Sequence, residues 1–298
     1  MTVRMALSPG EKGNKAMVGT VIVALDGSKL AEQALPIAQQ IAEHMEVVIT
    51  LLQVIPPDAP AELRDEASVY LEETALALAF PTQVMIRIGE PAAEIIAGAA
   101  EMPAPVIVMT THGRGGLGRL LYGSVADQVV RDSHVPVLLV RAGLAPSASQ
   151  PLKSILVPLD GSAYAETALP PAIELACAFD ADLWLARVAE ANMALGDPLK
   201  TRALAEGYHH AVQEAGAYLD AVAERLGDTG VRIYTQQLAG FAEDEILAFE
   251  RQVAIDLVVI ATRPRSSGLG GLGIQNLAQD VLRHGVAPIL MIRTAVVA

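Results

Sequence analysis

The sequence predicts an α/β protein built from two tandem copies of an open, five-stranded parallel sheet flanked by helices. Three observations lead to this fold class. One pattern occurs twice along the 298 residues, short aliphatic segments alternate with helical ones, and several aliphatic segments are continuous runs of Val, Ile and Leu. Such runs are typical of parallel strands covered on both faces. The alternation calls for right-handed crossovers, with helices on both sides of the sheet.

The repeat is visible without a gap over the first part of each copy. Residues 20–55 align with residues 154–189 at an offset of 134, and both stretches contain Leu-Asp-Gly-Ser followed by Ala-Glu-x-Ala-Leu-Pro. The ends of the copies align at an offset of 152, so the second copy is about 18 residues longer. Most of the extra residues fall in a helical insertion at about 190–216, which we interpret as a lengthened helix.

These matches set the expected domain boundaries. We expect a loose leader over residues 1–17, a first domain over 18–143, a linker over 144–151 and a second domain over 152–298. The join is rich in Ala, Pro and Ser, which is the composition of a linker.

Within the first copy, each element follows from its local pattern. Stretches rich in Val, Ile and Leu predict strands, and the amphipathic stretches between them predict helices. An Asp-Gly-Ser turn follows the first strand, and a glycine-rich loop follows the fourth. The predicted strands lie near residues 18–25, 46–55, 83–88, 105–110 and 136–141. The second copy repeats this order.

Charge and hydropathy exclude several functional classes. The net charge of −13 is divided evenly, with 10 Lys and Arg against 16 Asp and Glu in residues 1–146, and 11 against 18 in residues 147–298. This field repels phosphate backbones, and the sequence has no basic stripe with interleaved aromatics, so we expect no nucleic-acid partner. No apolar run reaches the roughly 18 residues of a membrane span. The first 17 residues also lack the pattern of a secretory signal.

The reactive residue types suggest binding rather than catalysis. A single cysteine, Cys177, excludes an internal disulfide and favours a reducing, cytoplasmic location. We expect Cys177 to be a buried small hydrophobic residue in a helix. The histidines show no metal-site spacing, and no nucleophile triad or positioned base is evident, so we predict no metal ligand and no catalytic residue.

The stretch 109–127, MTTHGRGGLGRLLYGSVAD, is the strongest functional signal from the residues alone. It holds five glycines, two of which are Gly113 and Gly123, and Ser124 then opens a helical segment. Glycines let backbone amides approach a ligand closely, and a helix N-terminus favours an anion. A phosphate-binding loop and a simple helix-entry loop both remain open at this point, because the Lys of a Walker A motif is missing.

The spacing Thr110-x-x-Gly113-(nine residues)-Gly123-Ser124, with Asp26 after the first strand, resembles the nucleotide-binding pattern of the universal stress protein family. The resemblance covers nearly the whole chain as two tandem copies. It implies a sheet of strand order 3-2-1-4-5 and, in many members, bound ATP or AMP, with Mg²⁺ accompanying a triphosphate. It also implies pairing through the fifth strands, so we expect the two halves to pack as an intramolecular pseudo-dimer, while a further homodimer and a protein partner stay open.

The resemblance also assigns residues to a nucleotide site between the first and fourth strands. Two positions depart from the family pattern: Thr110 stands where glycine is the strictest form, and Ala24 replaces a frequent proline. The implied residues are Ala24 and Asp26 near adenine and ribose, Val54 at the adenine edge, Met109 and Thr110 along the ribose, and Gly113, Gly123, Ser124 and Val125 at the phosphates.

The second copy keeps the base end of this pattern but loses the phosphate end. The alignment places Arg265 opposite Gly113, Gln275 opposite Gly123 and Asn276 opposite Ser124. Asp160, Pro158 and Val188 are retained at the base end. We therefore expect one working site, in the first copy, and a degenerate second copy.

The function implied by the resemblance is a nucleotide-binding regulatory protein of the stress response, with at most slow hydrolysis. Whether it is an enzyme at all is left open, with a non-enzyme favoured. Two alternatives remain: a ligand-free structural or interaction protein, and a nucleotide-using enzyme of related fold. The signature His-x-Gly-His or Ser-Gly-Gly-x-Asp-Ser of such an enzyme does not occur in the sequence.

Overall fold

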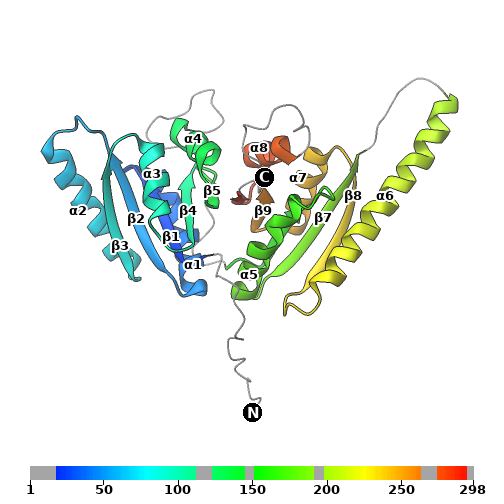
Figure 1. Ribbon diagram of the computed structural model, residues 1–298, viewed down its shortest axis with the longest axis horizontal. Helices are drawn as coiled ribbons and strands as arrows, with labels where there is room; N and C mark the ends of the chain where they lie inside the picture. The colour runs from blue at the N-terminus through cyan, green and yellow to red at the C-terminus, as the bar shows by residue number, and fades with distance from the viewer. Residues whose placement is uncertain (1–17, 112–122, 145–150, 191–197, 263–273, 294–298) are drawn as a thin grey trace, which may run out of the picture.

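The computed structural model describes residues 18–111, 123–144, 151–190, 198–262 and 274–293 (Figure 1). Each half alternates strands and helices in the predicted order. The elements of the first half are β1 (Thr20–Leu25), the 3-10 helix η1 (Ala31–Ala34), α1 (Leu35–Met45), β2 (Val48–Ile55), α2 (Ala61–Leu78), β3 (Thr82–Ile88), α3 (Pro91–Ala100), β4 (Pro105–Thr110), α4 (Ser124–Asp132) and β5 (Val137–Val140).

The second half repeats the same order of elements. They are β6 (Ser154–Pro158), η2 (Ala165–Ala168), α5 (Leu169–Phe179), β7 (Asp182–Glu190), α6 (Pro198–Leu226), β8 (Ile233–Gly240), α7 (Ala242–Val253), β9 (Leu257–Ala261), α8 (Ile274–His284) and β10 (Ile289–Ile292). Helix α6 has 29 residues against 18 in its counterpart α2, and it spans most of the interval in which the sequence predicts a lengthened helix.

The strands form one continuous ten-stranded sheet of order β3-β2-β1-β4-β5-β10-β9-β6-β7-β8. Each half therefore has the expected order 3-2-1-4-5, and its neighbouring strands run parallel. The halves meet where β5 pairs antiparallel with β10, with Leu138 opposite Leu290. The pseudo-dimer is thus confirmed, but its two sheets join edge to edge into one, because each fifth strand covers the backbone edge of the other.

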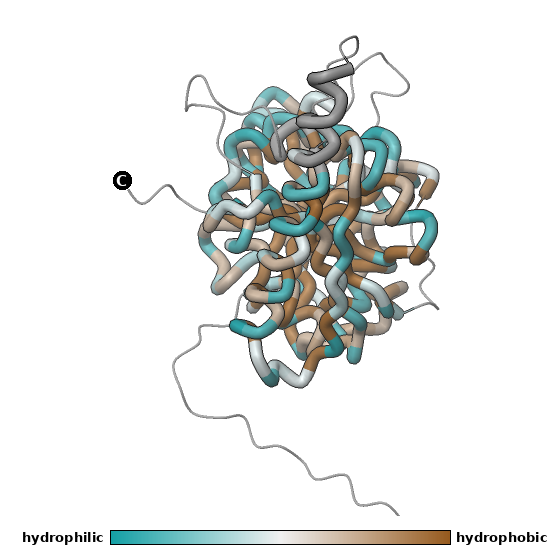
Figure 2. Tube along the Cα trace, turned by 90° about the vertical axis from the view of Figure 1, so that its right-hand side faces the viewer, coloured by the Kyte–Doolittle hydropathy of each residue, from teal (hydrophilic) through white to brown (hydrophobic). Residues whose placement is uncertain are grey.

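The core lies on both faces of this sheet. Val21 and Val23 of β1 belong to one apolar cluster, which α1, α2, α5 and α6 cover, whereas Ile22 and Ala24 belong to the other, beneath α3, α4, α7 and α8. Successive side chains of a strand point to opposite faces, so a strand covered on both sides must be apolar throughout. In Figure 1, α2 and α6 lie along the outer flanks of the sheet and α4 and α8 lie at the top centre, and Figure 2 shows hydrophobic residues gathered in the interior.

The structure also bears on the predictions for Cys177 and for membrane-spanning segments. Cys177 is exposed on α5, so its predicted burial is wrong. It follows the buried Leu175 and Ala176, and the turn of the helix carries it past the apolar face. Among the described residues, no helix is both long enough and apolar enough to cross a membrane.

Candidate functional site

The predicted site residues gather where β1 and β4 part at their carboxyl ends. The ladder between these strands ends with Val23 opposite Val108. Ala24 and Met109, the next residues of each strand, are therefore not paired with each other. In an open parallel sheet, ligands bind at such a point, where the strand order reverses.

The side chains at this point are largely buried. Ala24 is 8% exposed, Met109 6% and Thr110 5%, so a ligand at these strand ends would meet them mainly through their backbone. Val54 lies one residue beyond Gln53, which is the last β2 partner of β1, and its half-buried side chain packs against the α3 and α4 face. All four residues therefore lie at the same end of the sheet.

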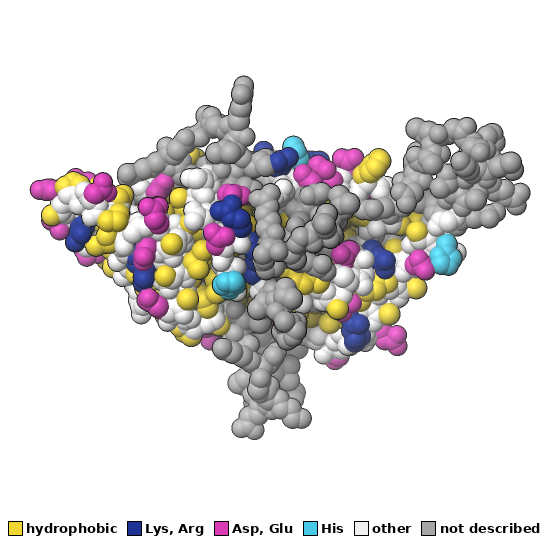
Figure 3. Space-filling model, turned by 45° about the horizontal axis from the view of Figure 1, so that its top comes forward, with side chains coloured by type: hydrophobic (Ala, Val, Ile, Leu, Met, Phe, Trp, Pro, Cys, Tyr) yellow, Lys and Arg dark blue, Asp and Glu magenta, His cyan; other side chains and the backbone are white. Residues whose placement is uncertain are grey.

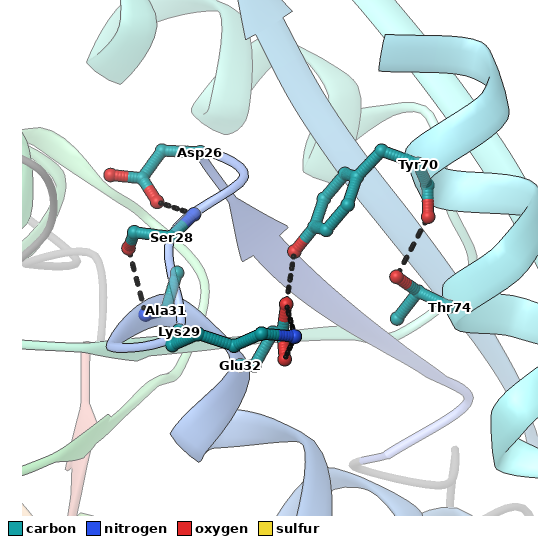
Figure 4. A network of polar contacts seen from close by, with 7 residues as sticks. All are labelled: Asp26, Ser28, Lys29, Ala31, Glu32, Tyr70 and Thr74. Carbon is teal, nitrogen blue, oxygen red and sulfur yellow. Dashed lines mark hydrogen bonds and ion pairs between the residues drawn. The ribbon is translucent and has the colours of Figure 1, made fainter. Parts of the chain in front are cut away.

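Asp26 begins a tight turn immediately beyond β1. Its Oδ1 accepts the amide of Ser28 at 2.9 Å, and the Ser28 Oγ accepts the amide of Ala31 at 3.1 Å (Figure 4). Gly27 between them has φ +80°, a conformation that favours glycine. The Asx-turn role of Asp26 is therefore present, and it holds the carboxylate just beyond the carboxyl end of β1.

A polar network supports this turn from α2. The Tyr70 hydroxyl donates to Glu32 Oε1 at 3.3 Å, and Lys29 Nζ lies 2.8 Å from Glu32 Oε2 (Figure 4). Burial, together with the Glu32 charge, raises the pKa of Tyr70 to about 12. The second half repeats the contact, because the Tyr218 hydroxyl donates to Glu166 Oε1 at 2.9 Å. This Tyr–Glu pair was not predicted from the sequence, where its signal is the Ala-Glu that is repeated after each Asp-Gly-Ser turn.

The phosphate end of the predicted site begins at α4. Gly123 is the N-cap, and Ser124 is the first residue of the helix, as the sequence predicts. The Gly123 amide donates to the Thr111 carbonyl at 2.6 Å, so this donor is used within the protein. The first intrahelical bond runs from Asp127 to Gly123, which leaves the amides before Asp127 without intrahelical acceptors. Ser124 is exposed.

The base of the glycine-rich loop is anchored to β5. The Thr111 amide donates to the Val140 carbonyl at 2.9 Å, and the Ala142 amide donates to Thr111 Oγ1 at 3.4 Å. Gly113, which the sequence assigned to the phosphates, lies outside the described residues.

The second half differs from the first at the start of its last helix and at the residues beside its Asp-Gly-Ser turn. Helix α8 begins at Ile274, two residues before the position aligned with Ser124, so Gln275 stands inside a helix where the first half has the N-cap Gly123. At the base end, the Arg187 guanidinium lies against Gly161, with its Cζ 3.1 Å from the position of an added Cβ, and 4.8 Å from the Tyr218 ring centroid. The aligned residue in the first half is Gln53.

The described surface on this side of the molecule is mixed in charge (Figure 3). Figure 3 brings the side of α4 and α8 into view, and acidic side chains lie on both wings with basic ones among them. An anion would therefore be held by local donors rather than by the overall field. Within the described residues, no group of three or more His, Cys, Asp or Glu side chains is placed to hold a metal ion.

The sequence model of the universal stress protein family matches this chain twice, over residues 17–141 and 151–293. The chain belongs to that family. Its two halves are tandem universal stress protein repeats, and the family resemblance expected from the sequence is confirmed.

Relatives of one-repeat length align with about half of this universal stress protein. A universal stress protein of Methanocaldococcus jannaschii is 29% identical over 146 residues, which are 47% of this chain and 82% of that protein. The protein YxiE of Bacillus subtilis is 28% identical over 148 residues, which are 42% of this chain and all of YxiE.

A solved structure matches nearly the whole chain. The crystal structure of a universal stress protein from Archaeoglobus fulgidus has a TM-score of 0.70 at 20% identity, and covers 93% of this chain and 98% of its own. This match supports the tandem fold.

Proposed function

We propose that the first half of this universal stress protein binds an adenine nucleotide, ATP or AMP, where β1 and β4 part. One observation carries the proposal: the end of the β1–β4 ladder, the turn that starts at Asp26 and the N-terminus of α4 all lie at one end of the sheet. A helix N-terminus supplies amide donors and a dipole that favour phosphate. The nucleotide-binding pattern that the sequence resembles points to the same class of ligand.

In the proposed complex, the base and ribose lie over the strand ends and the phosphates lie over α4. Because the Gly123 amide is bonded to Thr111, the main phosphate donors are the Ser124 hydroxyl and the amides of the first turn of α4. Mg²⁺ would arrive with a triphosphate, held by phosphate oxygens and few protein ligands. The proposed contacts are Ala24, Asp26, Val54, Met109, Thr110, Gly113, Gly123, Ser124 and Val125.

The proposed role is regulatory. Nucleotide binding changes the surface that the protein presents to a protein partner in the stress response, with at most slow hydrolysis, and the compartment is the cytoplasm. The binding domain is 18–143, after a leader over 1–17, and a linker over 144–151 joins it to the second domain, 152–298. The second domain acts as the structural partner of the first, since its helix α8 begins earlier and Arg187 occupies its base end.

Equilibrium binding of ATP, AMP and adenosine to the full chain tests this proposal. Gly123→Asp should lower ATP affinity by at least about tenfold, because it places a carboxylate beside the phosphates. Gln275→Asp puts the same charge at the aligned position of the second half, and should leave ATP affinity unchanged. Ser124→Ala should cost about tenfold in ATP affinity and little in adenosine affinity.

Two results would redirect the proposal. If the wild type does not bind ATP or AMP at millimolar concentration, the protein is a ligand-free scaffold. If it releases phosphate over many turnovers well above background, it is an enzyme of related fold.

A further inference from the structure

Two arginines in equivalent positions cross the boundary between the halves. Arg141 directly follows β5, and Arg293 directly follows β10, at the alignment offset of 152. Because β5 and β10 run antiparallel, the residue after each strand lies beside the start of the other strand. That start is where the last helix of the opposite half ends.

Each arginine binds a carbonyl at the C-terminal end of that opposite helix. Arg141 Nη1 donates to the carbonyl of Gly285, directly after α8, at 3.1 Å. Arg293 Nη2 donates to the carbonyl of Val130, in the last turn of α4. The last carbonyls of a helix lack intrahelical donors and carry the negative end of its dipole, so a guanidinium there is stabilising.

The Arg293 side chain has buried guanidinium nitrogens. Its Nε and Nη1 atoms are buried and have no hydrogen-bond partner, so the Val130 carbonyl is its acceptor. Among the described residues, the Asp132 carboxylate supplies a further electrostatic attraction. A guanidinium keeps its charge in proteins. Burying a charged group whose donors lack partners is strongly unfavourable, so losing the hydrogen bond to the Val130 carbonyl would be costly. The contact between Arg293 and α4 therefore stabilises the interface between the two halves.

The helix that Arg293 holds is the one that opens the proposed phosphate site. Val130 is six residues from Ser124, which is roughly 9 Å along a helix. At its N-cap the same helix is held by the bond from the Gly123 amide to the Thr111 carbonyl. A two-turn helix moves as one body, so a shift at Val130 displaces the Ser124 hydroxyl and the first-turn amides with it.

We propose that Arg293 is a positioning residue for the phosphate end of the nucleotide site. The second half, through this side chain, holds α4 where its N-terminus meets the phosphates, and nucleotide binding in the first half is thereby coupled to the packing of the two halves. Arg141 holds α8 in the same way, but α8 opens no intact phosphate site. The inference rests on the proposed function, and it gives the second half a direct part in that function.

The pseudo-symmetry supplies a matched control. In the full chain, Arg293→Ala should speed hydrogen exchange of the α4 amides, and Arg141→Ala should speed that of the α8 amides. Arg293→Ala should weaken ATP binding about tenfold and leave adenosine binding unchanged, because α4 meets only the phosphates. Arg141→Ala should change neither affinity. Arg293→Lys, which keeps the charge and one donor, should fall between wild type and Arg293→Ala, and it serves as the test if Arg293→Ala does not fold.

Several outcomes would overturn the inference. Unchanged α4 exchange in Arg293→Ala would show that the arginine does not hold the helix. Equal losses of ATP and adenosine affinity, or equal effects of the two alanine variants, would show general destabilisation instead of positioning. A wild type that binds no nucleotide overturns the proposed function and the phosphate role together, whereas normal ATP binding by Arg293→Ala overturns the inference alone.

Discussion

His44 of α1 and Phe179 of α5 stack face to face across the boundary between the halves. Their ring centroids are 4.0 Å apart, and the ring planes differ by 13°. Phe179 is 8% exposed, and His44 Nδ1 lies 2.9 Å from the Gln40 carbonyl oxygen. This contact lies on the α1 and α5 side of the sheet, opposite α4 and α8 (Figure 1). The halves are therefore joined on both faces as well as by β5 and β10.

We expect His44 and Phe179 to be energetically coupled. Stacked aromatic pairs contribute about 0.5–1.5 kcal/mol beyond their burial. A double-mutant cycle with His44→Ala and Phe179→Ala, measured by urea unfolding, should return a coupling energy in this range. Phe179→Ala alone should cost about 3 kcal/mol of unfolding free energy, because it leaves a cavity. Strictly additive losses would mean that the stacking adds nothing.

Glu250 should make stability depend on pH. Its side chain is fully buried on α7, and its Oε1 accepts the amides of Val286 and Ala287, each at 2.6 Å. Burial raises the pKa of this carboxyl above its ordinary value, and the two amide bonds offset part of the rise. A raised pKa means that the folded state holds the proton more tightly. The Glu250 contribution to stability is therefore largest below the unfolded pKa of about 4, and falls as pH rises through the folded pKa.

The variant Glu250→Gln keeps the acceptor oxygen and removes the titration. The difference in unfolding free energy, wild type minus variant, should decline from about pH 4 upward and then level off. Parallel curves for the two proteins between pH 4 and 8 would contradict this. Glu250→Ala should be destabilising by about 2–5 kcal/mol at all of these pH values, because it leaves the part-buried Val286 amide and the buried Ala287 amide without an acceptor.

The Tyr70 hydroxyl should ionise at a higher pH than an ordinary tyrosine. Burial and the neighbouring Glu32 raise its pKa to about 12, and burial with Glu166 also raises the pKa of Tyr218. The folded state favours the neutral phenols, so their contribution is complete below about pH 10 and is lost as pH rises through the folded values. Absorbance at alkaline pH should show a late phase in the native protein that Tyr70→Phe reduces. A single phase near pH 10 for all six tyrosines would contradict this.

Cys177 should react in the folded protein. Its side chain is exposed, and its Sγ donates to the Thr229 carbonyl at 3.4 Å. Partial burial and Glu174 raise the pKa of the thiol, so the reactive thiolate is scarce at neutral pH. We expect one equivalent of a thiol reagent to be consumed slowly without denaturant, and faster as pH rises above 9. A thiol that reacts only after unfolding would restore the original prediction of burial.

The site could be predicted from the sequence only in part. The turn at Asp26 and the start of α4 at Ser124 were predictable, because an Asp-Gly-Ser turn and a Gly-Ser helix start are local patterns. The bond between the Gly123 amide and the Thr111 carbonyl was not predictable, since it joins the end of β4 to the start of α4, which are neighbours only in the folded chain. The contact of Arg187 with Gly161 was not predicted, because it forms only when β6 and β7 are neighbours in the sheet.

The sequence by itself determined the duplication, the strands and helices, and the loss of the phosphate pattern in the second copy. These features are encoded by periodicity and by short motifs, which act over a few residues. Tertiary structure decided the joining of two sheets into one, the burial of Glu250 and the crossing contacts of Arg141 and Arg293. Those arginines reach carbonyls 144 and 163 residues away, and on the sequence they are ordinary charged residues after a strand. Their partners exist only once the two halves have packed.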